Sequence, residues 1–199
     1  MNAIKKHLSQ DEILKRVINS SGMMEFQSTN NVFNDLMSCV LEQQIHYRSA
    51  KQIFQRMLAK AELTELNLAN FAQFEEFGMR DYKISMKKLE SMNAVVTYFE
   101  QNSHNWAQLE DHEIRTILSS IQGIGDWTID MILLFTLGRP NIFPWGDFHL
   151  KNCMTELYDI KSRYKANMNE IAELWQPFSS VATLFLLEFK KKKLKLPSS

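Results

Sequence analysis

Residues 118–151 of the chain read LSSIQGIGDWTIDMILLFTLGRPNIFPWGDFHLK, and this stretch decides the fold that we expect. Gly123 and Gly125 stand one residue apart between two helical patterns. Glycine permits the positive φ and the close backbone approach that a tight turn needs. Ile124 between them is expected to tuck inward and lock the two helices together. The stretch therefore predicts a helix–hairpin–helix motif over about residues 112–137, followed by a loop and by Asp147 at the start of another helix.

Helical patterns dominate the rest of the chain as well. Apolar residues recur at helical spacing, and the 6 Gly and 4 Pro are too few for the turns of an all-β fold. Ser9 and Glu12 have the spacing of a capping box, and Asp111 and Asp126 are placed to cap later helices. We expect an all-α fold in a single helical domain, residues 1–199. The predicted helices cover about residues 10–18, 32–41, 48–58, 71–78, 85–99, 112–120, 127–137, 148–158, 167–175 and 178–190.

The composition excludes several classes of protein. Lys plus Arg and Asp plus Glu number 23 each, so the net charge is zero, which argues against a broad nucleic-acid coat but not against a small, localised DNA-binding site. The two cysteines, Cys39 and Cys153, are too few for a disulfide framework or a four-cysteine metal centre. No apolar run reaches the roughly 20 residues of a membrane span, and the N-terminal residues lack the apolar core of a signal peptide. We expect a reduced, intracellular protein with no side-chain metal site and no cofactor.

The turn of the predicted hairpin has the features of an anion-binding site. The amides after the second glycine, at the start of the next helix, point outward, and the helix dipole favours a phosphate there. Such a contact grips a nucleic-acid backbone without reading its sequence. An ordinary helical corner also explains the pattern, because short glycine motifs recur by chance. The candidate DNA-binding residues of the turn are Gly123, Ile124, Gly125, Asp126 and Thr128.

Asp147 follows the short loop of Pro144, Trp145 and Gly146. Aspartate is a favoured N-cap, so capping alone explains its position. A carboxylate beside DNA can also do chemistry. Cleavage of a base–sugar bond builds positive charge on the sugar, and a carboxylate stabilises that oxocarbenium-like state and orients or deprotonates water. Structural and catalytic roles for Asp147 are both open at this point.

Two segments resemble the helix–hairpin–helix DNA glycosylases, namely IQGIGDWT at residues 121–128 and FPWGD at residues 143–147. In that superfamily a Gly/Pro-rich loop and an essential aspartate follow the hairpin. VLEQQI at residues 40–45 and WQPFSSVA at residues 175–182 are similar to elements of the 3-methyladenine DNA glycosylase II type. The resemblance covers about residues 30–190 and implies two helical lobes with a cleft between them. Departures at Glu42, Gly146, Ser179 and Leu187 concern the range of substrates more than the type of reaction.

The resemblance also implies roles for single residues. Asp147 becomes the catalytic residue. Trp127, which can stack on an extruded base, lines a base pocket with Met131 and Trp145, although all three could instead be core residues. Strand-cutting relatives have lysine at the position of Trp127, so this chain is expected to use water and to be monofunctional.

Two further implications concern the contact with DNA. Gln43 and Gln44 are candidate DNA-binding residues, and Gln44 is the candidate side chain that fills the space of a flipped base. Local capping by the two amides is the alternative. The hairpin backbone of the family often holds a monovalent cation through carbonyl groups, so the resemblance also implies a possible monovalent cation at this hairpin.

The sequence therefore predicts a monofunctional DNA N-glycosylase of base excision repair that excises alkylated purines such as 3-methyladenine and 7-methylguanine. The alternatives are a non-catalytic DNA-binding or lesion-sensing protein, and a glycosylase for deaminated or mispaired bases. The expected partner is double-stranded DNA with a damaged base, bound by a monomer. The expected location is inside the cell, and in the cytoplasm in association with the nucleoid if the protein is bacterial.

Overall fold

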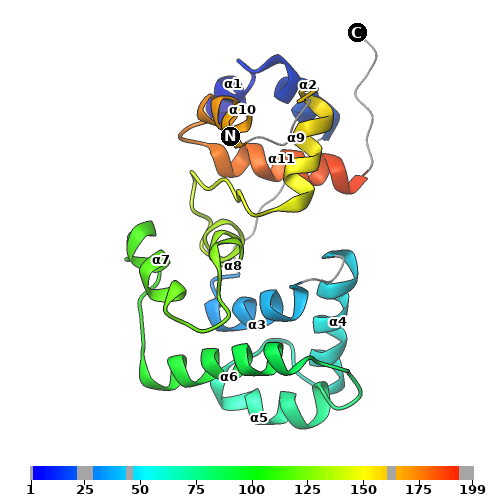
Figure 1. Cartoon of the computed structure of the whole chain (residues 1–199), viewed down its shortest axis with the longest axis vertical. Coiled ribbons are helices and arrows are strands. Elements are labelled where there is room, and N and C mark those ends of the chain that lie inside the picture. Colours follow the sequence, from blue (N-terminus) through cyan, green and yellow to red (C-terminus); the bar gives the residue numbers. More distant parts are fainter. Residues whose placement is uncertain (1, 22–28, 44–46, 161–164, 193–199) are drawn as a thin grey trace. The chain divides into compact units, whose positions relative to one another are not determined.

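The structure is a computed structural model that describes residues 2–21, 29–43, 47–160 and 165–192, and every regular element in these ranges is helical (Figure 1). The all-α prediction is therefore confirmed. The chain divides into two compact units. The first, here the Asp147 unit, combines residues 1–27 with residues 138–199. The second, here the hairpin unit, is the continuous segment 28–137.

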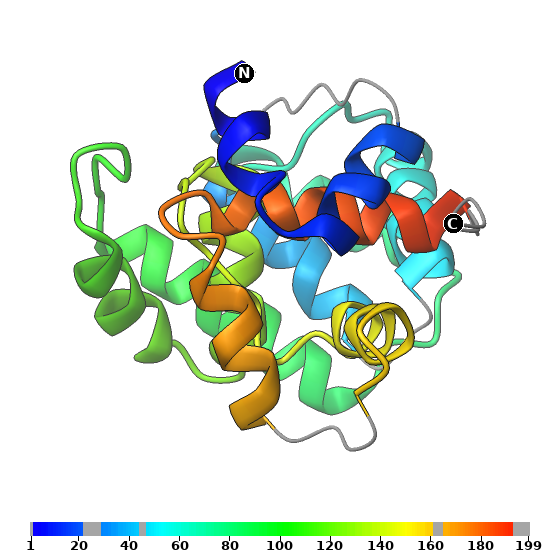
Figure 2. The same ribbon diagram turned by 90° about the horizontal axis from the view of Figure 1, so that it is seen from above.

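The Asp147 unit is built from both ends of the chain. Both α2 and α9 pack against α11, and Figure 2 shows the blue α2 lying on the orange and red α11. Its helices are α1 (Asn2–Leu8), α2 (Glu12–Ser21), α9 (Phe148–Leu157), α10 (Lys165–Glu173) and α11 (Ser179–Lys192). Its core consists of apolar side chains from all five helices, among them Leu8, Leu14, Val17, Leu150, Met154, Met168, Phe185 and Leu186, together with Trp175 from the turn between α10 and α11.

The half-buried carboxylate of Asp11 joins the two halves of the Asp147 unit. Asp11 Oδ1 accepts the backbone N–H groups of Ile13 and Leu14 at 2.9 and 3.0 Å, and thereby caps α2. Its Oδ2 accepts the Tyr158 hydroxyl at 2.6 Å and Trp175 Nε1 at 2.9 Å. Burial, with Asp11 close by, raises the pKa of Tyr158. The cap of this helix is thus Asp11 and not the expected Ser9.

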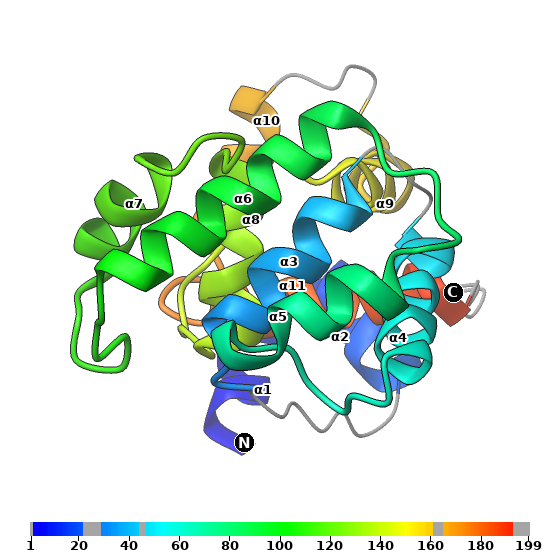
Figure 3. The same ribbon diagram turned by 90° about the horizontal axis from the view of Figure 1, so that it is seen from below.

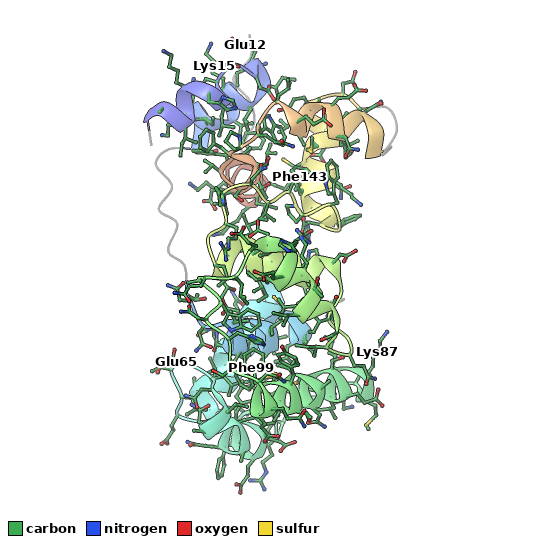
Figure 4. All side chains as sticks on the ribbon, turned by 90° about the vertical axis from the view of Figure 1, so that its left-hand side faces the viewer. Glu12, Lys15, Glu65, Lys87, Phe99 and Phe143 are labelled. Atoms are coloured by element: carbon green, nitrogen blue, oxygen red, sulfur yellow. The ribbon has the colours of Figure 1, made fainter. Side chains whose placement is uncertain are left out.

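The surface of α2 carries an ordinary charge pair. Lys15 Nζ lies 3.0 Å from Glu12 Oε1, three residues earlier in the helix, and both side chains are exposed (Figure 4). Such pairs contribute little to stability because water screens them.

The hairpin unit is a bundle around α3. The helix α3 packs against both α4 and α6, as seen from below in Figure 3. Its elements are α3 (Val32–Glu42), α4 (Tyr47–Lys60), η1 (Leu68–Asn70), α5 (Phe71–Gln73), η2 (Phe74–Gly78), α6 (Met86–Gln101), α7 (Asp111–Ser119), α8 (Asp126–Met131) and η3 (Ile132–Thr136). Fully buried side chains include Leu36, Met37, Val40, Phe54, Phe74, Val95, Ile114, Leu118 and Leu133.

The two helices of the hairpin differ in detail from the expectation. Glu110, not Asp111, stands at the N-cap of α7, and its backbone N–H donates to the Glu113 carboxylate at 2.8 Å. Gly125, not Asp126, is the N-cap of α8. The expected helix 127–137 is present, but its second half, η3, has the wider π-helical winding.

Candidate functional site

The turn between α7 and α8 requires glycine at its first position. Gly123 has φ +85°, a conformation that L side chains rarely adopt. A Cβ atom there would lie 1.9 Å from Ser91 Oγ on α6, far inside van der Waals contact. The turn is closed by the Ile124 N–H, which donates to the Ile121 carbonyl at 3.1 Å, and the Ile124 side chain is buried as expected. The turn therefore rests directly on α6.

Gly125 has a different role from Gly123. Its φ of −106° is open to any residue, and an added Cβ would meet nothing within 4 Å. This glycine leaves open space in front of the first turn of α8, where backbone amides lack helical carbonyl partners and the dipole is positive. Asp126 occupies that first turn and is exposed. The geometry allows another backbone to come close at Gly125.

An ion pair ties the two hairpin helices together. Arg115 on α7 lies 2.6 Å from Asp130 on α8, and the Asp130 side chain is only 7% exposed. Burial raises the pKa of Asp130, and the Arg115 guanidinium opposes that rise. The pair fixes the angle between the helices that flank the turn. The sequence did not indicate this ion pair, because an arginine and an aspartate each also suit a solvent-exposed helix face.

The end of α3 contacts the hairpin turn through Gln43. Its Nε2 donates to the Gly123 carbonyl at 3.2 Å and to Thr128 Oγ1 at 3.3 Å. Thr128 is 1% exposed, so its side chain faces Gln43 and the interior of the unit. Gln44, the candidate side chain for filling the space of a flipped base, lies outside the described residues.

Two of the expected pocket residues share one face of α8. Trp127 and Met131 are four residues apart, which places their side chains above one another on the helix. Trp127 is half-buried, whereas Met131 is buried. An indole that is partly open to solvent can stack on a planar ligand, while Met131 is placed to support it from within the unit.

Asp147 is positioned in the other unit by a short turn and a helix start. Its backbone N–H donates to the Pro144 carbonyl at 2.9 Å. Its Oδ1 accepts the Leu150 N–H at 2.7 Å and caps α9. The residue is 8% exposed. The expected N-cap is therefore present, and it fixes the carboxylate in one orientation.

The loop that leads to Asp147 is pinned by the start of α11. Ser180 Oγ donates to the Arg139 carbonyl and accepts the Ile142 N–H at 2.8 Å, and Ser180 N–H donates to the Pro140 carbonyl at 3.1 Å. Beside it, Ser179 Oγ donates to Asn141 Oδ1 at 2.7 Å. This anchoring gives the WQPFSSVA segment a physical role that the sequence alone did not suggest.

Trp145, the third expected pocket residue, belongs to an aromatic cluster of the Asp147 unit. Its ring centroid lies 4.3 Å from that of Phe143, which in turn lies 5.8 Å from that of Trp175. Trp145 is half-buried against the core. The structure thus groups Trp145 with Asp147 in one unit, and the expected hairpin residues with Trp127, Met131 and Gln43 in the other.

Other kinds of site are absent from the described parts of the chain. In residues 2–21, 29–43, 47–160 and 165–192, no three His, Cys, Asp or Glu side chains gather in a way that could hold a metal ion. None of the described helices combines the length and the apolar character that crossing a membrane requires.

Comparison with known proteins gives consistent matches. Residues 37–177 match the sequence model described as "HhH-GPD superfamily base excision DNA repair protein". The chain is 28% identical over 166 residues to the YfjP protein of Bacillus subtilis (strain 168), covering 78% of this chain and 58% of YfjP. It is 26% identical over 200 residues to the protein named DNA-3-methyladenine glycosylase 1 of Schizosaccharomyces pombe, covering 93% of this chain and 86% of the relative.

A solved structure has the same fold. The S. pombe 3-methyladenine DNA glycosylase Mag1, determined in complex with abasic DNA, superposes with a TM-score of 0.78 at 24% identity, covering 99% of this chain and 100% of that one. The expected resemblance to 3-methyladenine DNA glycosylases is therefore confirmed, while the chain spans only 58% of the length of its YfjP relative.

Proposed function

Because the chain belongs to the HhH-GPD superfamily of base excision DNA repair proteins, we propose that it is a monofunctional DNA N-glycosylase that excises alkylated purines such as 3-methyladenine and 7-methylguanine. The observation that carries the proposal is the buried carboxylate of Asp147, held in one orientation by the Leu150 N–H and placed 22 residues after Gly125. The proposed substrate is damaged double-stranded DNA inside the cell, and we propose that the protein acts on it as a monomer.

Asp147 supplies charge to the reaction. When the bond between base and sugar breaks, its electron pair leaves with the base and positive charge develops on the sugar. A carboxylate stabilises that charge, and it accepts the proton of the water that adds to the sugar carbon. Capping of α9 through Oδ1 leaves the negative charge in place, so structural and catalytic roles are compatible in one residue.

The chemistry of the leaving base favours alkylated purines. A purine alkylated at N3 or N7 is cationic and leaves as a neutral base, so no general acid has to protonate it. The same cation is attracted by the face of an indole, here Trp127, by roughly 0.5–2 kcal/mol depending on how far it is desolvated. Flipping the nucleotide out of the duplex brings the base to this ring.

Water, rather than an amine of the protein, is the proposed nucleophile. Trp127 occupies the position at which strand-cutting glycosylases have lysine, and its indole nitrogen cannot form a Schiff base. The product is then free base and an intact abasic strand. Borohydride reduction tests this point, because a trapped covalent protein–DNA adduct in high yield would contradict it.

Single-turnover release of bases from matched duplexes tests the proposal as a whole. We expect 3-methyladenine and 7-methylguanine to be released much faster than hypoxanthine or uracil, and Trp127→Leu to narrow the difference. Asp147→Asn serves as the inactive control. Equal or faster release of hypoxanthine or uracil would point to a glycosylase for deaminated bases. Binding without release of any base would point to a non-catalytic lesion sensor.

A further inference from the structure

The side chain of Gln43 bridges the hairpin turn. The backbone N–H of Gln43 ends α3 by donating to the Cys39 carbonyl at 3.0 Å. Its amide nitrogen then donates both of its hydrogens to the hairpin, one to the Gly123 carbonyl in the turn and one to Thr128 Oγ1 in the first turn of α8. One side chain thus joins the two sides of the turn.

The orientation of this amide is fixed by its neighbours. The Gly123 carbonyl can only accept, so a flipped amide would set two acceptor oxygens against each other. The peptide between Gly123 and Ile124 is therefore held at both ends. Gln43 binds its carbonyl, and the Ile121 carbonyl binds its N–H.

The helix α6 supports the same two elements from beneath. Lys88 Nζ donates to the Leu41 carbonyl near the end of α3 at 2.7 Å. Ser91, three residues later on the same face, sits against Gly123. The end of α3 and the hairpin turn are consequently both supported by α6, and the Gln43 side chain connects them directly.

We infer that Gln43 is a positioning residue that holds the hairpin turn in the geometry that binds the DNA backbone, and does not itself contact DNA. The inference rests on the proposed function only in that the hairpin binds DNA. Loss of the Gln43 amide weakens DNA binding, because the turn loses its fixed shape, but leaves the bond-breaking step unchanged once DNA is bound.

Binding and chemistry are measured separately to test this. Fluorescence anisotropy measures the affinity for an undamaged duplex. The single-turnover rate of base release is measured at saturating protein concentration. Gln43→Leu is expected to raise the Kd by about tenfold, the scale of two neutral hydrogen bonds. Gln43→Glu is expected to raise it further, because a carboxylate only accepts and would face the Gly123 carbonyl. The saturated rate should stay within about twofold of wild type for Gln43→Leu.

Thr128 distinguishes positioning from direct contact with DNA. Its side chain is buried and lies on the hydrogen bond in question. Thr128→Val should therefore weaken DNA binding, whereas Thr128→Ser keeps the hydroxyl and should bind as tightly as wild type. The Gln43→Leu/Thr128→Val double variant should lose less binding free energy than the sum of the two single losses. If Gln43 instead contacts DNA directly, Thr128→Val has no effect and the double variant is additive. That result would overturn the inference.

Two controls make the outcome unambiguous. Gln55→Leu, the same exchange at an exposed position of α4, should change neither affinity nor rate. An equal loss in this variant would contradict a specific role for Gln43. Thermal melting checks that the variants are folded, and if Gln43→Leu does not fold, the Thr128→Val and Thr128→Ser pair still decides. A wild-type protein that binds DNA but releases no base would refute the proposed function, while the affinity comparison would still test Gln43.

Discussion

Substitution can separate the capping of α9 by Asp147, which the structure shows, from the catalytic charge that we propose for this residue. The cap is a buried hydrogen bond of 2.7 Å from the Leu150 N–H to Oδ1. Asn and Ser keep an acceptor at this position, and both are good N-caps, so Asp147→Asn and Asp147→Ser should change the unfolding free energy by only a few tenths of a kcal/mol. Asp147→Ala removes the acceptor and should cost about 1 kcal/mol, or about 2–4 °C in Tm for a chain of this size.

The rate of base release should not follow stability across these three variants. All three variants lack the charge, so each should lose a factor of about 10²–10³ or more in the rate of base release, the scale of removing one electrostatic stabiliser. Single-turnover release of 7-methylguanine from a methylated duplex measures the rate, thermal melting measures stability, and anisotropy checks that DNA binding is kept.

Comparison of rate and stability across the three variants distinguishes capping from catalysis. If activity followed stability, so that Asp147→Asn remained active and only Asp147→Ala failed, then capping alone would explain the residue. Near wild-type turnover of Asp147→Asn would remove Asp147 from the reaction altogether.

The two glycines of the turn and the ion pair beside it give further predictions. Gly123→Ala should lower the unfolding free energy by about 2 kcal/mol or more in chemical denaturation, because φ is +85° and the methyl group would meet Ser91. Gly125→Ala should leave stability within about 0.5 kcal/mol but weaken binding to unrelated duplexes by similar factors. Loss on one sequence only would indicate base readout instead. Arg115→Met should cost about 1–2 kcal/mol at pH 7, below the range for a fully buried pair because Arg115 is 41% exposed. Burial already raises the pKa of Asp130 and loss of Arg115 raises it further, so protonation of the carboxyl in the folded state should shrink this cost as the pH falls from 7 to 5. A constant cost over that range would show that Asp130 stays ionised.

Local patterns predicted most of the fold. Apolar spacing placed α3 and α6 to within about two residues, because each buries a broad stripe that leaves a clear period in the sequence. The start of α2 was misassigned to Ser9. What selects Asp11 is its bonding to Tyr158 and Trp175, which lie 147 and 164 positions away in the sequence. The short helix α1 was missed as well, since seven residues carry little periodic signal.

The candidate site was predictable where it depends on backbone geometry. The glycine pair indicated the hairpin, and the N-cap preference of aspartate indicated the start of α9 at Asp147, whereas its catalytic role comes from the family resemblance and stays a prediction. The side chains that hold the hairpin turn and the loop before Asp147 in place were not predictable, because they act across long sequence separations. Gln43 reaches Gly123 over 80 positions, and Ser180 reaches Ile142 over 38. A polar residue that completes a distant turn has no local pattern of its own.

The discontinuity of the Asp147 unit has a consequence for how the protein is made. Residues 28–137 form one uninterrupted segment, so the hairpin unit can complete its core while the ribosome is still translating the remainder. The Asp147 unit has to wait for α11, whose side chains supply much of its core and whose Ser180 anchors the loop before α9. During synthesis the hairpin is therefore complete before the carboxylate is fixed. Under the proposed function, a nascent chain acquires its DNA-binding turn before its catalytic carboxylate.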